Sequence, residues 1–270
     1  MSEAALIEPA ALSVTFPPTQ DELPCDDGVP METERHKLQM DLLIYALKPW
    51  LNRQAEGGYV GGNMFMYFSL EQVRNRDFRG PDVFVVLGVP RRERKSWVLW
   101  EEGKGPDVVI ELLSGQTAGE DKGRKKTIYQ NQLKVAEYFW FDPFDPDDWA
   151  GFDLHHGVYE ALPPDDRGCL ISKRLGLALV RWQGNYADVE ATWLRWATLE
   201  GNLLPTPQEM AEAEAQRAET EKQRAETEKQ RAETEAQRAE TEARRAVEAE
   251  AEVARLQALL ASQGDSSINQ

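Results

Sequence analysis

The stretch over residues 106–129 constrains the fold of this chain more than any other part of it. It opens with an apolar run over 108–113 that contains a single carboxylate, Glu111. Side chains alternate along a strand, so Val109 lies on the same face as Glu111 and the intervening residues face the other way. A run that is apolar on both faces indicates a strand buried between two layers. A carboxylate inside it needs a cation, a proton or strong hydrogen-bond donors.

The residues after this strand predict a partner for Glu111. Helical spacing extends over about 119–133, and its apolar positions mark the face that packs on the sheet. At about 100° per residue, Lys125 lies roughly 40° from Tyr129 and 60° from Ile128, in the middle of that face. We therefore expect Lys125 to pair with Glu111. Such a pair is compatible with a purely structural ion pair and with a catalytic site.

A second carboxylate, Asp82, opens another short apolar strand, PDVFVV. Two carboxylates on neighbouring strands can hold Mg²⁺, which is commonly bound by one or two carboxylates and keeps several waters. Asp107 also follows a proline, but it shares a strand with Glu111 about 13 Å away, too far to bind the same ion. We therefore expect Asp82 to be the second ligand and Asp107 to anchor the start of its strand.

The rest of the first 200 residues reads as further strands and helices. Spacing of three and four residues predicts a helix over about 33–51, and residues 150–205 are expected to form hairpins that extend the sheet or cover its edge. Other strands are expected over 63–70, 81–90, 96–105 and 137–143. Basic stretches at RNRDFR, RRERK and KGRKK either ring the site, where they would contact phosphates, or form separate surface loops.

From Glu209 the composition changes to a seven-residue repeat, with QRAETEK twice and then QRAETEA twice. These are strong helix formers and predict one long helix. Its seam is mostly alanine with two lysines, which makes a weak coiled coil, so a solvated single helix and an oligomerising one remain alternatives. The expected domains are a flexible arm over 1–30, an α/β domain over 31–207, a heptad-repeat helix over 208–262 and a disordered tail over 263–270.

Charge and cysteine content restrict the classes of protein that fit. The net charge is −16, of which residues 208–270 contribute −6 and residues 1–207 contribute −10. This counts against a broad non-specific nucleic-acid surface and leaves room for a local basic cleft. Cys25 and Cys169 are far apart and fit free thiols in a reducing cytosol. No apolar run approaches the ~20 residues that span a bilayer, and we expect a soluble cytoplasmic protein.

The order of four motifs resembles the Uma-type family of putative restriction endonucleases, which is itself similar to the PD-(D/E)XK nuclease superfamily. The motifs are PDVFVV, PDVVIELLS, D-x-x-x-K-x-x-x-Y and EYFWFDP. The resemblance covers about residues 30–200. It implies an α/β fold with a central mixed sheet flanked by helices. It also implies a Mg²⁺- or Mn²⁺-dependent endonuclease that acts on DNA.

The resemblance also implies roles for single residues. Asp82 corresponds to the carboxylate of the PD motif, Glu111 to the second acidic ligand and Lys125 to a lysine carried by the helix. The superfamily lysine normally stands two residues after the second acid, where this chain has Leu113. Glu32 corresponds to an acidic residue of the first helix. Two further polar residues of that helix are expected within reach of the site: His36 and Gln39.

A second interpretation is a catalytically inactive nuclease fold that serves as an interaction or scaffolding protein and oligomerises through its C-terminal helix. The acidic charge and the repetitive helix favour it. We expect a dimer or higher oligomer under either interpretation.

Overall fold

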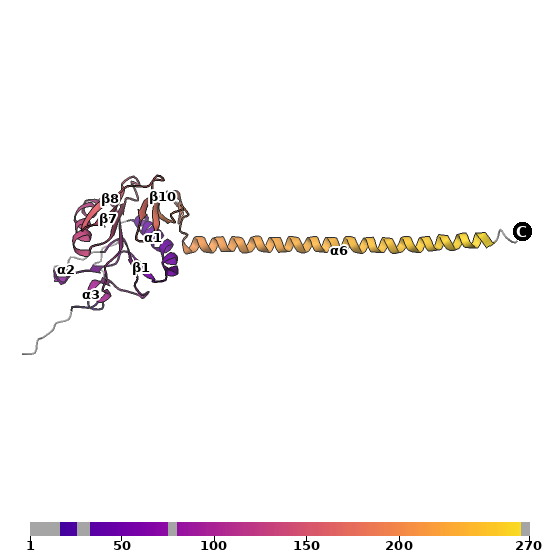
Figure 1. Ribbon diagram of the computed structural model, residues 1–270, viewed down its shortest axis with the longest axis horizontal. Helices are drawn as coiled ribbons and strands as arrows, with labels where there is room; N and C mark the ends of the chain where they lie inside the picture. Colours follow the sequence, from indigo (N-terminus) through magenta and orange to yellow (C-terminus); the bar gives the residue numbers. More distant parts are fainter. Residues whose placement is uncertain (1–16, 26–32, 75–79, 266–270) are drawn as a thin grey trace, which may run out of the picture. The chain divides into compact units, whose positions relative to one another are not determined.

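A computed structural model describes residues 17–25, 33–74 and 80–265 of the chain (Figure 1). The chain divides into two compact units, Met1–Pro207 and Gln208–Gln270, each of which is described by itself. The first unit contains three sheets and the shorter helices. The second is a single long helix.

A six-stranded mixed sheet forms the centre of the first unit. Strands β5 and β6 run parallel to each other, and every other neighbouring pair is antiparallel. The predicted α/β class with a central mixed sheet is therefore confirmed. In spatial order the strands are β1 (Gly58–Gly61), β3 (Val83–Leu87), β5 (Val108–Leu112), β6 (Glu137–Phe141), β7 (Trp149–His155) and β8 (Val158–Leu162).

One face of this sheet is covered by helix α1 (Glu34–Arg53) and by a second sheet. The helix begins after Thr33, whose side chain accepts a hydrogen bond from the His36 backbone N–H and caps the helix. Gln39 ties α1 to the second sheet, because its side chain pairs with both the N–H and the C=O of Leu194. The second sheet consists of β11 (Val189–Ala197), β10 (Leu177–Tyr186) and β9 (Leu170–Ser172).

The opposite face is covered by a continuous helical segment over residues 118–133. Ile128, Tyr129 and Leu133 pack there against apolar residues of β3, β5 and β6. The helix predicted over 119–133 is thus confirmed, but two of its turns are π-helical, which the sequence did not predict. The four parts are α4 (Ala118–Glu120), η1 (Asp121–Lys125), α5 (Lys126–Ile128) and η2 (Tyr129–Leu133).

The expectation for residues 63–70 is wrong in extent. Only β2 (Met66–Tyr67) is a strand there, and helix α2 (Leu70–Arg74) follows it. Edge strand β1 lies instead in the glycine-rich residues just before. A side chain on Gly58 would crowd Leu51 and the Val86 carbonyl at 3.0 Å, so glycine allows this strand to approach α1 closely.

The strand expected over 96–105 is also shorter than predicted. It consists of β4 (Trp97–Val98), which pairs in parallel with β2, and the chain turns at once into helix α3 (Leu99–Glu102). The left-handed conformation of Gly103 ends that helix.

Part of the expected flexible arm packs on the rest of the first unit. Leu23 is buried against Tyr67 and Val98, and the Tyr67 hydroxyl and Trp100 indole donate to the carbonyls of Pro24 and Pro18. These contacts hold the described residues 17–25. The remainder of the arm lies outside the described residues.

The second unit contains helix α6 (Pro207–Asp265), which confirms the predicted long helix (Figure 1). Every side chain over 211–258 is exposed. Each complete repeat has a threonine that donates to the carbonyl four residues earlier, as Thr220 does to Gln216. Within the described ranges, no helix is long and apolar enough to cross a membrane.

Candidate functional site

Two carboxylates meet where β3 begins and β5 ends. These strands are antiparallel, so Asp82, just before β3, lies beside Glu111 near the end of β5. The Asp82 backbone N–H donates to Glu111 Oε2 at 3.4 Å, and the Leu112 backbone N–H donates to Asp82 Oδ2 at 2.7 Å. The expected neighbourhood of Asp82 and Glu111 is therefore present in the fold.

The helical segment brings Lys125 to the same place. Its Nζ lies 3.2 Å from Glu111 Oε2, which confirms the expected ion pair, and 2.7 Å from Asp121 Oδ1. Glu111 shares its face of β5 with Val109, which packs in the cluster formed with the helical segment. Strand alternation and helix spacing together thus locate the pair correctly.

The sequence assigned no role to two residues that complete this cluster. The Tyr129 hydroxyl donates to Glu111 Oε1 at 2.7 Å, and Asp121 pairs with Lys125. Asp121, Lys125 and Tyr129 are spaced by four residues, and this spacing was the available signal. Residues four apart on a helical segment lie on the same face. This alignment lets all three reach the same end of β5.

Burial dominates the electrostatics of the carboxylates. Glu111 is fully buried, and this raises its pKa to about 7 although Lys125 opposes the shift. Burial and the neighbouring Glu111 raise the pKa of Asp121 to about 6, and burial also raises the pKa of Asp82. Burial alone would lower the pKa of Lys125, but the surrounding carboxylates outweigh it and raise that pKa. The ammonium is therefore retained, and negative charge remains in excess.

This charge imbalance provides a test of whether a divalent cation fits. Three carboxylates face one ammonium, and the Asp121 carboxylate is buried. In the part of the chain that the structure describes, no three His, Cys, Asp or Glu side chains form a ready metal site. Two carboxylates, Asp82 and Glu111, nevertheless suffice for Mg²⁺, which completes its shell with water and substrate phosphate oxygens. The residues present fit such an ion.

The first helix contributes less than expected. Glu32 lies outside the described residues. His36 reaches the end of β5, where its Nε2 lies 2.9 Å from the Leu113 carbonyl oxygen and its Nδ1 2.8 Å from Thr33 Oγ1. Gln39 does not join the site, because both ends of its amide are hydrogen-bonded to the backbone of β11. The expected anchoring role of Asp107 is confirmed, since its Oδ2 accepts from the Leu87 N–H at 2.7 Å.

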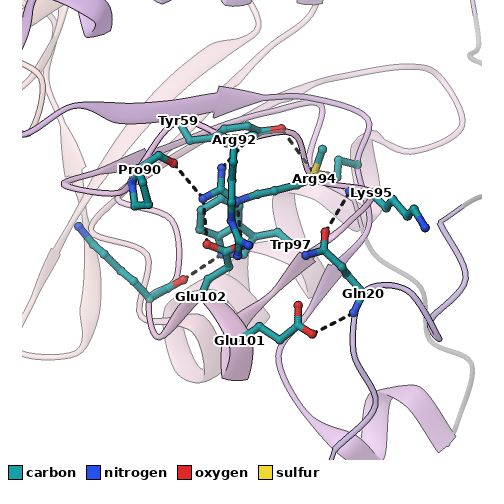
Figure 2. A network of polar contacts seen from close by, with 11 residues as sticks. Gln20, Tyr59, Pro90, Arg92, Arg94, Lys95, Trp97, Glu101 and Glu102 are labelled. Atoms are coloured by element: carbon teal, nitrogen blue, oxygen red, sulfur yellow. Dashed lines mark hydrogen bonds and ion pairs between the residues drawn. The ribbon is translucent and has the colours of Figure 1, made fainter.

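The basic stretch RRERK does not ring the site. It follows the end of β3 that lies beside the start of β5, whereas Glu111 lies near the opposite end of that strand. Figure 2 shows Arg92 and Arg94 converging on Glu102, with Arg94 lying over the rings of Tyr59 and Trp97. Arg94 and Glu102 are buried while Arg92 is half exposed, and together they hold the loop to α3.

The other two basic stretches differ from this one. Residues 75–79, most of RNRDFR, lie outside the described residues. In KGRKK, Lys125 belongs to the site, Lys122 pairs with Asp148, and Lys126 lies 3.3 Å above the Phe152 ring centroid. One lysine of this stretch is thus turned into the carboxylate cluster and two are turned toward β6 and β7.

Comparison with known proteins identifies a family that the chain resembles over most of its first unit. Residues 26–178, more than half of the chain, match the model of a protein family described as "Uma2: Putative restriction endonuclease". The matched range includes Asp82, Glu111 and Lys125. No curated protein matches the sequence.

Proposed function

The chain belongs to the Uma2 family of putative restriction endonucleases, and from this premise we propose that it is a metal-dependent endonuclease that hydrolyses phosphodiester bonds in DNA. One observation carries the proposal beyond the family description. Asp82 and Glu111 lie side by side on neighbouring strands, and Lys125 reaches Glu111 at 3.2 Å from the helical segment. An acidic pair can hold a divalent ion against a phosphodiester, and a lysine beside it can stabilise the charge that develops there.

Asp82 and Glu111 would hold Mg²⁺ or Mn²⁺. When bound, the ion would lower the pKa of a coordinated water and offset the charge that develops on the phosphate. Tyr129 occupies Glu111 Oε1, so Oε2 is the oxygen that faces Asp82 and Lys125. The tyrosine thereby fixes which edge of the carboxylate points into the site.

Lys125 supplies a fixed positive charge. Its ammonium is held inside a mostly buried cluster, where electrostatic interactions are stronger than in water. We assign to it the stabilisation of negative charge that builds on the phosphate during hydrolysis. Its place on the helix substitutes for the lysine that the superfamily carries on the strand, where this chain has Leu113.

Cleavage of supercoiled plasmid DNA in Mg²⁺ or Mn²⁺ tests this function. We expect Glu111→Ala and Lys125→Ala each to reduce the cleavage rate by a factor of about 100 or more. Glu137→Gln is the control, because Glu137 is also a buried carboxylate but binds Ser172 and the Arg174 N–H away from the site. Cleavage that neither site substitution changes would overturn the assignment.

We place this activity in the cytoplasm. Cys25 and Cys169 are both free thiols in the structure. Reducing compartments keep thiols in this state, and a DNA substrate is available there in cells without a nucleus. Cys169 is buried and Cys25 is exposed.

A second candidate function is that of a scaffolding protein with a nuclease fold that no longer cleaves. The exposure of Val253 and Leu256 on α6, at 53% and 51%, favours self-association through this helix. Absence of Mn²⁺ binding by calorimetry, with self-association that disappears on truncation after Pro207, would favour this function over the enzyme. The two functions share the oligomeric state, and we propose a homo-oligomer for both.

A further inference from the structure

The site contains one ammonium shared between carboxylates on two different elements. Lys125 Nζ is closer to Asp121, at 2.7 Å, than to Glu111, at 3.2 Å. Asp121 lies four residues before Lys125 on the same π turn, whereas Glu111 belongs to the sheet. The lysine is thus held by its own helix and only bridges to the strand.

We propose that Asp121 is a positioning residue that retains Lys125 in the site when a divalent cation takes its place as the counter-ion of Glu111. This inference rests on the proposed function, because it concerns the same cation. It assigns Asp121 to neither substrate nor metal. Asp121 acts through the lysine.

Crowding of positive charge on Glu111 gives such a residue a role. Glu111 Oε1 accepts from Tyr129, and Oε2 already faces the Asp82 N–H and the Lys125 ammonium, so a cation bound at Oε2 would lie beside the ammonium. Two positive charges on one buried oxygen repel each other strongly where water is scarce. Without a second carboxylate, either the lysine would leave the site or the cation would bind weakly.

Asp121 is built to supply that second carboxylate. Its own backbone carbonyl accepts from the buried Tyr138 hydroxyl at 2.9 Å, which fixes the turn against β6. Its Oδ1 already pairs with Lys125, and its carboxylate is buried. An ammonium has three donors, so the lysine can exchange its bond to Glu111 for a second bond to Asp121.

The arrangement also argues against Asp121 as a third metal ligand. The ammonium bridges Asp121 to Glu111, and the described residues contain no group of three potential ligands around one point. A role through Lys125 and a role as a ligand make different predictions. Removing the lysine abolishes the first role and leaves the second intact.

A double-mutant cycle on Mn²⁺ affinity, measured by calorimetry, separates these roles. The four proteins are the wild type, Asp121→Asn, Lys125→Met and the double variant, all of which keep side-chain volume. We expect Asp121→Asn to weaken Mn²⁺ binding about tenfold or more, because Lys125 then depends on Glu111 alone. In the Lys125→Met background, the same substitution should change the affinity less than about twofold, because Asp121 then has no lysine to position.

Two results would overturn the inference while leaving the proposed function intact. One is an equal loss of affinity on Asp121→Asn in both backgrounds, and the other is no loss in either. If the wild type binds no Mn²⁺, the proposed function fails and this inference fails with it. Asp121→Glu covers the case in which the asparagine variant does not fold. It keeps a carboxylate for Lys125 and should hold Mn²⁺ affinity within about threefold of wild type, and a tenfold loss would contradict the inference.

Discussion

Among single residues, Glu111 has an environment that couples the site to protein stability. It is fully buried, and its pKa is raised from 4.5 to about 7 mainly by that burial. Between these values the folded protein keeps the proton that the unfolded chain releases. The associated stability is present below pH 4.5 and is lost as the pH rises through about 7.

We therefore predict that the metal-free protein loses stability through Glu111 between about pH 5 and pH 8. At about 1.4 kcal/mol per pKa unit, the contribution of this residue is up to about 3 kcal/mol. Glu111→Gln removes the titrating group and should flatten the dependence. Urea unfolding of both proteins at the two pH values, in a chelator, measures the difference. Equal pH dependence in the wild type and the variant would show that Glu111 is not the group responsible.

Two features of the candidate site were predictable from the sequence, because each depends only on residues that are close together in the chain. The face of Glu111 follows from strand alternation, and the inward direction of Lys125 follows from helix spacing. The four-residue spacing indicated that Asp121 and Tyr129 share the face of Lys125, but it did not indicate that Tyr129 binds Glu111 or that Asp121 pairs with Lys125. Arg94 lies away from the site because its loop follows the end of β3 that pairs with the start of β5. This follows from the pairing of the two strands, which the sequence did not give.

At the scale of elements, the long apolar strands were predictable and the glycine-rich one was not. β3, β5 and β6 lie within the apolar runs from which they were predicted. β1 was missed because glycines weaken a strand signal, although here they allow close approach to α1. The two π turns also followed no expected pattern, since their residues have the same spacing that an α-helix would have.

A pair of glycine substitutions tests the description of these elements. Gly123 lies in the π turn η1 with open space around its α-carbon, and Gly123→Ala should stabilise the protein by about 0.5–1 kcal/mol. Gly151 in β7 has the Phe139 ring 2.7 Å from where a side chain would begin, so Gly151→Ala should destabilise it by about 1–3 kcal/mol. Chemical unfolding measures both. The same sign for both substitutions would contradict this description of the space around the two glycines.

At the scale of the whole molecule, the chain combines a nuclease-family unit with a 59-residue helix. An α-helix of that length extends about 90 Å. Its exposed repeat carries no large apolar side chain, and the first ones after it are Val247, Val253 and Leu256 near the end of the helix. The sequence predicted the helix because its residues are strong helix formers. Whether it associates depends on a second chain, which no pattern within one chain can determine.

We predict that self-association depends on this end of α6. Light scattering should give a mass above that of a monomer for the full chain and a monomer mass after truncation at Pro207. The double substitution Val253→Lys and Leu256→Lys should also give a monomer, because both side chains are half exposed and become charged. Gln216→Lys with Gln230→Lys is the control for added charge on the exposed repeat. A monomeric full-length protein, or an oligomer that survives truncation, would contradict this prediction.

The proposed metal site requires that Asp82 and Glu111 bind the same ion. A crystal structure with Mn²⁺, which anomalous scattering identifies directly, answers this. We predict one Mn²⁺ bonded to both carboxylates, with Lys125 Nζ moved away from Glu111 Oε2 and retained by Asp121. A structure in which Lys125 still occupies Glu111 and Mn²⁺ binds elsewhere or not at all would contradict the account.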